Sequence, residues 1–316
     1  MTKIPIIFIV GATASGKTDA GIRLAKRING EIISADSRYL YRGMDIGTAK
    51  VTKEETCGVP HHLIDVLDPK DPFNVMTFRS MVKDAIRGIA SRGSVPVLVG
   101  GTGFYIQSVL YDVQFEEDAS SEELRKELEQ EADVLGAEKM HERLRALDPD
   151  AAEAIHPNNI KRVVRALEYC LSTGRKISVH NREQRERTSP YSFLFYVLTM
   201  DRAALYQRID LRVDQMMEQG LLAEVKRLRD EGVTSDMVSM QGLGYRQIFD
   251  YLEGIATLDE AVERIKRETR HFAKRQLTWF RREPDARWIN VSEYGGDRKK
   301  ILEMMTEECL CLLEKN

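Results

Sequence analysis

The sequence has few cysteines, and their spacing predicts neither a metal centre nor a disulfide framework. Cys57, Cys170, Cys309 and Cys311 are scattered over 316 residues, with no CxxC pair and no Cys/His spacing suited to zinc. The six histidines show no metal spacing either. This cysteine usage is typical of a reducing compartment, so we expect a cytoplasmic protein.

Long apolar runs and a large charge excess are also absent. The N-terminal apolar run, Ile6–Val10, is too short to cross a membrane and leads into a glycine-rich loop. Lys and Arg number 47 against 50 Asp and Glu, a formal net charge of −3. That balance excludes a protein that is basic overall. A nucleic-acid partner remains open, because only local charge meets a phosphate.

The first hundred residues alternate short apolar runs with amphipathic segments, which is typical of βαβ units on a parallel sheet. The pattern predicts strands at Ile6–Val10, Glu31–Ala35 and Val95–Val99 and helices at Asp19–Asn29 and Met76–Arg92. The expected fold is therefore an α/β core, and because the glycine-rich loop after Ile6–Val10 also carries a phosphate-binding motif, a core of the P-loop NTPase type. At about 150 residues per domain, the length suggests two domains.

The charge pattern changes after Phe115. Glu116–Glu153 holds 14 acidic and 5 basic residues in a helical pattern, whereas Pro157–Thr188 holds 8 basic and 3 acidic residues. Strand-like composition returns at Phe193–Leu198. We therefore expect residues 1–114 to form the first part of the core and residues 115–192 to form an inserted all-helical domain. Residues 193–316 should form the rest of the core and a helical C-terminal region.

One motif carries a specific chemical prediction: the segment after the first strand matches G-x-x-x-x-G-K-[ST]. Glycines at both ends let the backbone curl so that its N–H groups point at a phosphate, and the following helix adds its positive dipole end. The lysine supplies a cation for phosphate oxygens, and the final hydroxyl can ligate Mg²⁺. The residues of this phosphate loop are Gly11, Ala12, Thr13, Ala14, Ser15, Gly16, Lys17 and Thr18.

The expected partner of such a loop in a nucleotide hydrolase is missing from its usual place. Hydrolases commonly carry a metal-binding Asp after a second strand, but Val95–Val99 is followed by Gly100-Gly101-Thr102-Gly103. The loop could therefore hold a diphosphate leaving group instead of a triphosphate to be hydrolysed. The alternative, an acid supplied from elsewhere in the chain, stays open.

Asp36 directly follows the second predicted strand, at the sheet edge that faces the ligand crevice in open α/β proteins. There it could accept a proton from a nucleophile or help to hold a metal. An Asp-Ser pair is equally suited to capping a turn, and spacing alone does not separate the two roles. The segment Tyr39–Lys50 adds aromatic, cationic and glycine residues, a composition used to stack on bases and touch phosphates.

Together these motifs closely resemble the tRNA dimethylallyltransferase family, also called tRNA isopentenyltransferases. The resemblance runs from about residue 4 to residue 282 in the family's order. Ala12 departs from it, because the family usually has Pro there. No Cys/His finger follows near the C-terminus, which favours the bacterial type. The matching motifs are the phosphate loop, Asp36–Arg38, Tyr41–Lys50, Pro60–Asp65, Gly100–Tyr105, Gly242–Gln247 and Phe272–Arg281.

The resemblance implies transfer of a dimethylallyl group from dimethylallyl diphosphate to the exocyclic N6 amine of an adenine. That adenine lies 3′ to the anticodon in tRNAs that read codons beginning with U. The reaction accounts for a phosphate loop without the hydrolase acid, because diphosphate is the leaving group. The implied roles are Asp36 as general base, Thr13, Ser15, Gly16, Lys17 and Thr18 around the diphosphate with Mg²⁺ near Thr18, Thr102 on the tRNA, and Arg208, or else Arg212, as a second cation.

By resemblance, the residues near the reacting base are Asp36, Ser37, Arg38, Tyr39 and Thr102. Two basic segments are expected to hold the rest of the anticodon stem-loop. The first consists of Lys161, Arg162, Val163, Val164 and Arg165. A second basic stretch, Arg264–Arg282, surrounds Trp279 and Phe280, which could equally be core residues.

For the transferase, a monomer that clamps one stem-loop is the simplest state. Two other functions compete with the transferase. A small-molecule or nucleoside kinase would bind ATP in the same loop and turn it over without RNA. A non-catalytic RNA-binding protein would not need an intact Lys17, Thr18 and Asp36.

Overall fold

The computed structural model describes residues 3–113, 122–295 and 297–315. The chain divides into two compact units, one of Met1–Leu110 with Pro190–Asn316 and the other of Tyr111–Ser189. The expected boundary between residues 114 and 115 lies outside the described residues. Ser192, the expected last residue of the insertion, is already the first residue of a strand of the larger unit.

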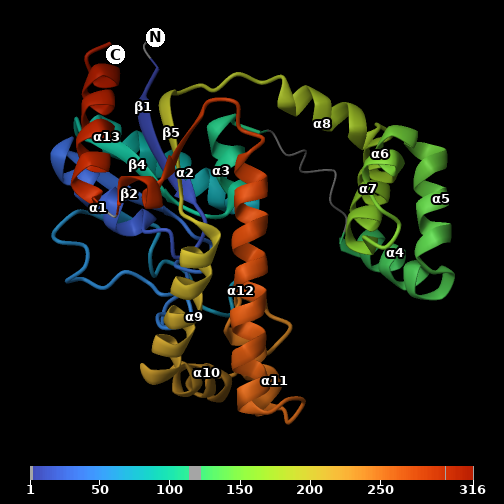
Figure 1. The fold of residues 1–316 in the computed structure, drawn as a ribbon. Coiled ribbons are helices and arrows are strands. Elements are labelled where there is room, and N and C mark those ends of the chain that lie inside the picture. The colour runs from blue at the N-terminus through green and yellow to red at the C-terminus, as the bar shows by residue number, and fades with distance from the viewer. Residues whose placement is uncertain (1–2, 114–121, 296, 316) are drawn as a thin grey trace. The chain divides into compact units, whose positions relative to one another are not determined.

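The larger unit is built on a parallel six-stranded sheet in the order β3-β2-β4-β1-β5-β6 (Figure 1). Its strands are β1 (Pro5–Gly11), β2 (Gly30–Ala35), β3 (His61–His62), β4 (Val95–Gly100), β5 (Ser192–Thr199) and β6 (Ala286–Asn290). Its helices are α1 (Lys17–Arg27), α2 (Val75–Ser91), α3 (Gly103–Leu110), α9 (Arg202–Glu218), α10 (Leu221–Asp230), α11 (Tyr245–Leu252), α12 (Leu258–Phe280) and α13 (Arg298–Leu313). The α/β class expected from the sequence is confirmed.

The strand register brings three loops to one edge of this sheet. Val10 of β1 and Ala35 of β2 both pair with Gly100 of β4, and Gly11 pairs with Leu198 of β5. Neighbouring parallel strands lie about 4.8 Å apart. The residues that follow β1, β4 and β2 therefore leave the sheet side by side and at the same level.

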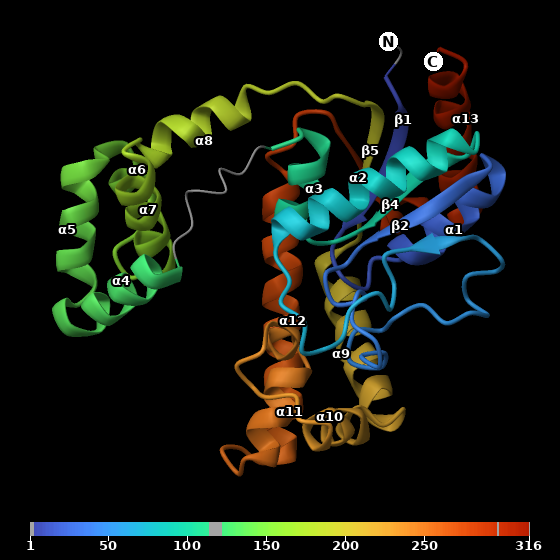
Figure 2. The ribbon, with the colours of Figure 1, turned by 180° about the vertical axis from the view of Figure 1, so that it is seen from behind.

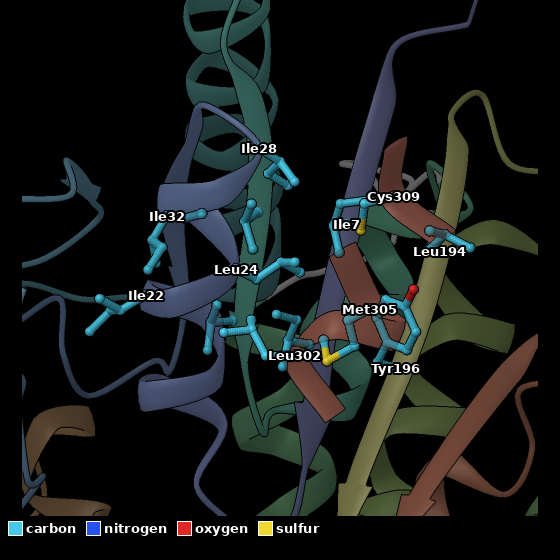
Figure 3. Close-up of a cluster of buried hydrophobic side chains, with 14 of the residues drawn as sticks. Ile7, Ile22, Leu24, Ile28, Ile32, Leu194, Tyr196, Leu302, Met305 and Cys309 are labelled. Carbon is cyan, nitrogen blue, oxygen red and sulfur yellow. The ribbon is translucent and has the colours of Figure 1, made fainter. Parts of the chain in front are cut away.

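Each strand buries alternate side chains on opposite faces of the sheet. Ile7 and Ile9 pack toward α1 and α13, in a cluster that includes Leu24 and Met305 (Figure 3). Phe8 points the other way and stacks on Phe195, with ring centroids 5.5 Å apart. This two-sided burial explains why the central strands are continuous apolar runs. Both views in Figures 1 and 2 show α9 and α12 running alongside each other below the sheet.

Three sequence expectations about this unit are corrected. The helix after the phosphate loop ends at Arg27, not Asn29, because Asn29 adopts a left-handed φ of 51° and Gly30 already belongs to β2. The sequence pattern places His61 and His62 before an apolar strand, but they form a short strand themselves. Strand β6 was not expected, since of its residues only Ile289 is buried and it therefore has no apolar run.

The smaller unit is helical, as the charge pattern suggested. Its helices are α4 (Glu122–Leu135), α5 (Ala137–Leu147), α6 (Pro149–Ala154), α7 (Ile160–Thr173) and α8 (Ile177–Arg185). Its core includes Leu128, Leu144 and Leu167. The fully buried carboxylate of Glu168 is neutralised by Arg125 at 3.0 Å and Arg165 at 2.9 Å. In the described part of the chain, no helix is long and apolar enough to span a membrane.

Gly11, the last residue of β1, leaves no room for a side chain between its backbone and β5. Its φ is +138°, and a Cβ there would lie 2.1 Å from the carbonyl oxygen of Leu198 on β5. Gly254, with a φ of +74° and nothing within 4 Å of its Cβ position, offers a matched control for backbone strain alone.

We expect Gly11→Ala to lower the free energy of unfolding by about 3 kcal/mol, because strain and steric overlap add. Gly254→Ala should cost only about 1 kcal/mol. Chemical denaturation of both variants measures the difference. Equal losses would contradict the close approach of β1 and β5 at this point.

Candidate active site

The phosphate loop is a curled backbone segment between β1 and α1. Gly11, Ala14 and Gly16 have φ values of 138°, 61° and 93°, and the Ser15 N–H donates to the Ala12 carbonyl at 3.3 Å. Helix α1 then begins at Lys17. The first N–H groups of a helix have no partner within it, and they carry the positive end of the helix dipole. The sequence thus builds an anion site from backbone alone.

The side chain of Ser15 indicates that this loop is shaped for a ligand. Its hydroxyl oxygen is buried and has no hydrogen-bond partner among the described residues. Leaving a buried polar group unpaired costs about 1–3 kcal/mol. An oxygen-rich ligand held by the loop would remove that cost.

The charge of Lys17, at the start of α1, is influenced by Arg212 of α9 and by Asp36 after β2. Burial and the Arg212 guanidinium lower the pKa of the Lys17 ammonium to about 7, while Asp36 acts in the opposite direction. Its Nζ donates to the Ala12 carbonyl at 2.6 Å, within the loop itself. A phosphate group would restore the charged form, because it replaces a desolvated environment with a strong anionic partner.

Asp36 follows β2 and serves as a turn cap, yet remains close enough to act on Lys17. Its Oδ1 accepts the Arg38 N–H at 3.0 Å, and among the described residues Oδ2 has no hydrogen bond. Capping and chemistry are therefore compatible, because they use different oxygens. The Tyr39 hydroxyl donates to the Ala49 carbonyl at 2.6 Å and lies beside Thr18, and burial above all raises its pKa.

Thr102 lies between these two features, as the strand order requires. It follows β4, which separates β1 from β2, and its carbonyl accepts the Ile106 N–H at the start of α3. The preceding carbonyl, of Gly101, accepts a hydrogen bond from Gln276 of α12 at 3.0 Å. The phosphate loop, Thr102 and Asp36 thus form a row along the sheet edge.

Gln276 was not assigned a role from the sequence. Its side chain is only 6% exposed, and its Oε1 accepts the Thr13 N–H at 2.8 Å. The signal in the sequence is a polar residue at a core position of an amphipathic helix, three residues after Ala273 and four before Phe280, both of which are buried. Gln276 lies inside the matching motif Phe272–Arg281, but nothing in that motif indicates which of its residues reaches the phosphate loop.

The second cation near the phosphate loop is better represented by Arg212 than by Arg208. The charge of Arg212 acts on both Lys17 and Tyr39. Arg208, one turn earlier on α9, is surrounded by positive charge: burial, then Arg298 and Arg212, lower its pKa. The surroundings of the two arginines therefore favour Arg212 as the second cation, whereas the sequence resemblance named Arg208 first.

The motif Tyr41–Lys50 is explained by a buried carboxylate. Glu224 of α10 accepts the N–H groups of three consecutive residues, Asp45, Ile46 and Gly47, at 2.9, 2.8 and 3.1 Å. The Tyr245 hydroxyl donates to the same carboxylate at 2.6 Å. The Glu224 carboxylate thus links the loop Tyr41–Lys50 to the motif Gly242–Gln247.

The residues expected on the tRNA separate into buried and exposed groups. Val163 and Val164 belong to the core of the smaller unit, so their side chains cannot form a contact surface, contrary to expectation. Lys161, Arg162 and Arg165 are exposed on the other side of α7. Ser37 is half-buried.

Arg38 and part of the second basic stretch are already engaged within the protein. The Arg38 guanidinium donates to the carbonyls of Val238 and Ser239. Phe280 is a core residue, whereas Trp279 packs edge-on against Phe104 with Arg282 over its ring at 5.1 Å. The aromatic residues of this stretch thus divide between core and surface.

A resident metal cluster is not part of this arrangement. Among the described residues, no group of three or more His, Cys, Asp or Glu side chains could hold a metal ion. Mg²⁺ bound together with phosphates needs only one or two protein oxygens, since water and the phosphates supply the rest. The Thr18 hydroxyl, at the first turn of α1, fits that requirement.

The parallel sheet and its phosphate loop define a P-loop α/β protein, and comparisons with known proteins define it further. The family model described as IPP transferase matches residues 39–283, so the chain belongs to the IPP transferase family. The resemblance found in the sequence is confirmed.

Individual relatives agree. The chain is 55% identical to a tRNA dimethylallyltransferase of Lachnoclostridium phytofermentans and 50% identical to that of Bacillus subtilis, covering 95% and 96% of this chain and 96% of each relative. Its structure is similar to the full-length tRNA isopentenylpyrophosphate transferase of Bacillus halodurans, with a TM-score of 0.74, 43% identity and full coverage of both chains. It is also similar to a eukaryotic dimethylallyltransferase acting on tRNA, with a TM-score of 0.77, 30% identity and 92% and 74% coverage.

The lowered pKa of Lys17 predicts how anion binding depends on pH. With a pKa of about 7, Lys17 loses its proton as the pH rises through neutrality, and an anion binds the protonated form better. The affinity of the wild type for inorganic pyrophosphate should therefore fall more steeply between about pH 6 and pH 9 than that of Lys17→Arg, which stays charged.

Isothermal titration calorimetry of both proteins gives this comparison, and the ratio of their affinities removes the titration of pyrophosphate itself. A ratio that does not change with pH would show that Lys17 is charged throughout this range.

Proposed function

We propose that this protein transfers a dimethylallyl group from dimethylallyl diphosphate to the exocyclic N6 of the adenine 3′ to the anticodon, in tRNAs that read codons beginning with U. The observation that carries the proposal is the row of groups along the sheet edge. A phosphate loop lies at one end and a carboxylate, Asp36, at the other, with Thr102 and no acid after the strand between them. Family membership supports the same reaction.

Stabilisation of the leaving group supplies most of the catalysis in this proposal. The bond between the allylic C1 and the diphosphate oxygen breaks while the adenine N6 bonds to C1, and negative charge develops on the diphosphate. The α1 N-terminus, Lys17 and the Ser15 hydroxyl meet that charge, and Arg212, with Arg208 one turn away, adds a further cation. Mg²⁺ held by Thr18 and the diphosphate would neutralise part of it.

Asp36 acts on the other reactant. The N6 amine is a weak nucleophile, because its lone pair is delocalised into the purine ring. As the new C–N bond forms, N6 becomes acidic and its proton passes to Asp36, whose Oδ2 is not used in the turn. Thr102 lies between acid and phosphate loop, in the position to contact the incoming nucleotide.

The RNA also needs contacts outside the reacting base. The adenine must leave the stack of the anticodon loop, since its N6 cannot otherwise enter a pocket. The exposed cations of α7, Lys161, Arg162 and Arg165, would contact the phosphate backbone, which contributes affinity without sequence information. We propose that a monomer acting in the cytoplasm binds one anticodon stem-loop.

The same loop could hold ATP, and a kinase is the alternative function from a different class. It requires a metal-binding acid near the γ-phosphate and no RNA. The relatives favour the transferase, since those compared above are tRNA prenyltransferases.

Transfer of label from dimethylallyl diphosphate to unmodified tRNA, with Mg²⁺ present, tests the reaction and the role of Asp36 together. We expect wild type to label the RNA, and Asp36→Asn to lower kcat by on the order of 10² while tRNA affinity stays within about tenfold. The asparagine keeps the acceptor for the Arg38 N–H, so it removes the base and preserves the turn.

Asp36→Ala removes both functions and serves as the comparison. If Asp36 were only a turn cap, Asp36→Asn would retain near-wild-type turnover and only the alanine variant would lose it. ATP-dependent phosphorylation of a small molecule without labelling of tRNA would overturn the transferase proposal.

Lys161→Ala tests the proposed backbone contact of α7. The variant should bind tRNA more weakly, and the slope of log affinity against log salt should fall by about 1 in magnitude, with pyrophosphate affinity unchanged. Lys139→Ala, an exposed lysine of α5 in the acidic part of the same unit, is the matched control and should leave the slope as it is. An unchanged slope for Lys161→Ala would place the RNA elsewhere.

A further inference from the structure

The carboxamide of Gln276 joins the loops that leave two neighbouring strands. Its Oε1 accepts the N–H of Thr13, in the loop after β1, at 2.8 Å, and its Nε2 donates to the carbonyl of Gly101, after β4, at 3.0 Å. Both ends of the amide are used, and the side chain is 94% buried. One side chain of α12 therefore holds the phosphate loop and the residue before Thr102 at a defined separation.

Helix α12 packs closely against the backbone on both sides of this bridge. A Cβ at Gly101 would lie 2.1 Å from Gln276 Nε2, and a Cβ at Gly103 would lie 2.2 Å from Cδ1 of Trp279, one turn further along α12. Ala273, on the same face of the helix, packs with Ala12 and Ala14 of the phosphate loop. Small residues on both partners thus let α12 approach the site closely.

The bridge also determines which backbone groups can face a phosphate. Because the Thr13 N–H donates to Gln276, it is directed at α12 and not into the loop. The cradle is then formed by the N–H groups that follow the left-handed turn at Ala14, together with the α1 N-terminus. A donor fixed before the reaction needs no reorganisation during it, which is the source of electrostatic catalysis by backbone N–H groups.

The same helix places a third part of the site. Lys266 pairs with Asp214 at 2.6 Å and Arg270 pairs with Asp210, and both aspartates belong to α9, the helix that carries Arg212. Helix α12 therefore contacts the phosphate loop, the Thr102 segment and the arginine helix. Among these contacts, only Gln276 bonds directly to the phosphate-loop backbone.

We propose that Gln276 is a positioning residue that orients the phosphate loop for diphosphate and aligns it with Thr102. The inference rests on the proposed function, because it assumes that the loop binds the diphosphate of the prenyl donor. A buried glutamine that contributed only to folding would have the same hydrogen bonds. The two roles differ in whether ligand affinity changes when the protein remains folded.

Gln276→Leu removes both hydrogen bonds at similar volume. Titration of the folded variant with inorganic pyrophosphate and Mg²⁺ should give a Kd about tenfold above wild type, the effect of one lost oriented donor. In the transfer assay, KM for dimethylallyl diphosphate should rise and kcat should fall, because Thr102 shifts with the loop. The Kd for tRNA should stay within about threefold of wild type, corresponding to under about 0.7 kcal/mol.

Gln247→Leu is the matched control. Gln247 of α11 is also fully buried, accepts the Gly244 N–H at 2.9 Å and donates to Glu268 at 2.9 Å, but has no bond to the phosphate loop. It should lose thermal stability to a similar extent as Gln276→Leu, with the pyrophosphate Kd unchanged. A parallel rise in Kd for both variants would attribute the effect to general loosening and overturn the proposal.

Gln276→Glu keeps the test decisive if the leucine variant does not fold. A protonated glutamic acid reproduces the acceptor for Thr13 and the donor for Gly101, whereas the carboxylate repels the Gly101 carbonyl. The ratio of its pyrophosphate Kd to that of wild type should therefore shrink as the pH is lowered. A ratio near one at every pH would overturn the positioning role.

The result for wild type distinguishes a failure of the positioning role from a failure of the proposed function. Wild type that binds no pyrophosphate and labels no tRNA would overturn both. Wild type that does both, alongside a folded Gln276→Leu with unchanged affinity and kinetics, would overturn the positioning role alone.

Discussion

The parallel pairing of β2, β4 and β1 is the constraint on which the rest of the structure depends. Because Ala35 and Val10 both lie opposite Gly100, the three loops that follow these strands start at one level of one sheet edge. Asp36, Thr102 and the phosphate loop come together for this reason, although no two of them are near in sequence. A shift of one strand by a single residue would misplace its loop by about 3.3 Å and reverse its buried face.

Strand pairing sets where the loops begin, and side chains from three helices then complete the site. Helix α12 reaches the phosphate loop through Gln276, and α9 brings Arg212 close enough to Lys17 to lower its pKa. Helix α10 contributes Glu224, which gathers three consecutive backbone N–H groups of the loop that follows Asp36. Gln276 and Glu224 are both buried polar side chains from distant segments, and each orders a loop of the site through hydrogen bonds to its backbone.

Much of this could be predicted from the sequence, and the omissions have physical causes. The β1 and β4 strands were found because buried parallel strands are continuous apolar runs, whereas β6, an edge strand with only Ile289 buried, has no such run. Asp36 could be placed at the sheet edge but its two roles could not be separated, because that requires knowing which oxygen accepts the Arg38 N–H. On α7, Lys161, Arg162 and Arg165 are exposed, whereas Val163 and Val164, expected on the tRNA with them, belong to the helical core, because consecutive residues of a helix lie on different faces.

The sequence by itself determined the phosphate loop, since eight consecutive residues contain the glycines, the lysine and the hydroxyl that the chemistry requires. It also determined the strands β1, β2, β4 and β5 and, through motifs spread along the chain, the family. Only the tertiary structure decided which side chains complete the site. Gln276 lies 263 residues from Thr13, and the choice of Arg212 over Arg208 depends on how α9 packs. A local motif depends on backbone conformation within a few residues, whereas these contacts depend on the packing of whole helices against the sheet, which no short pattern encodes.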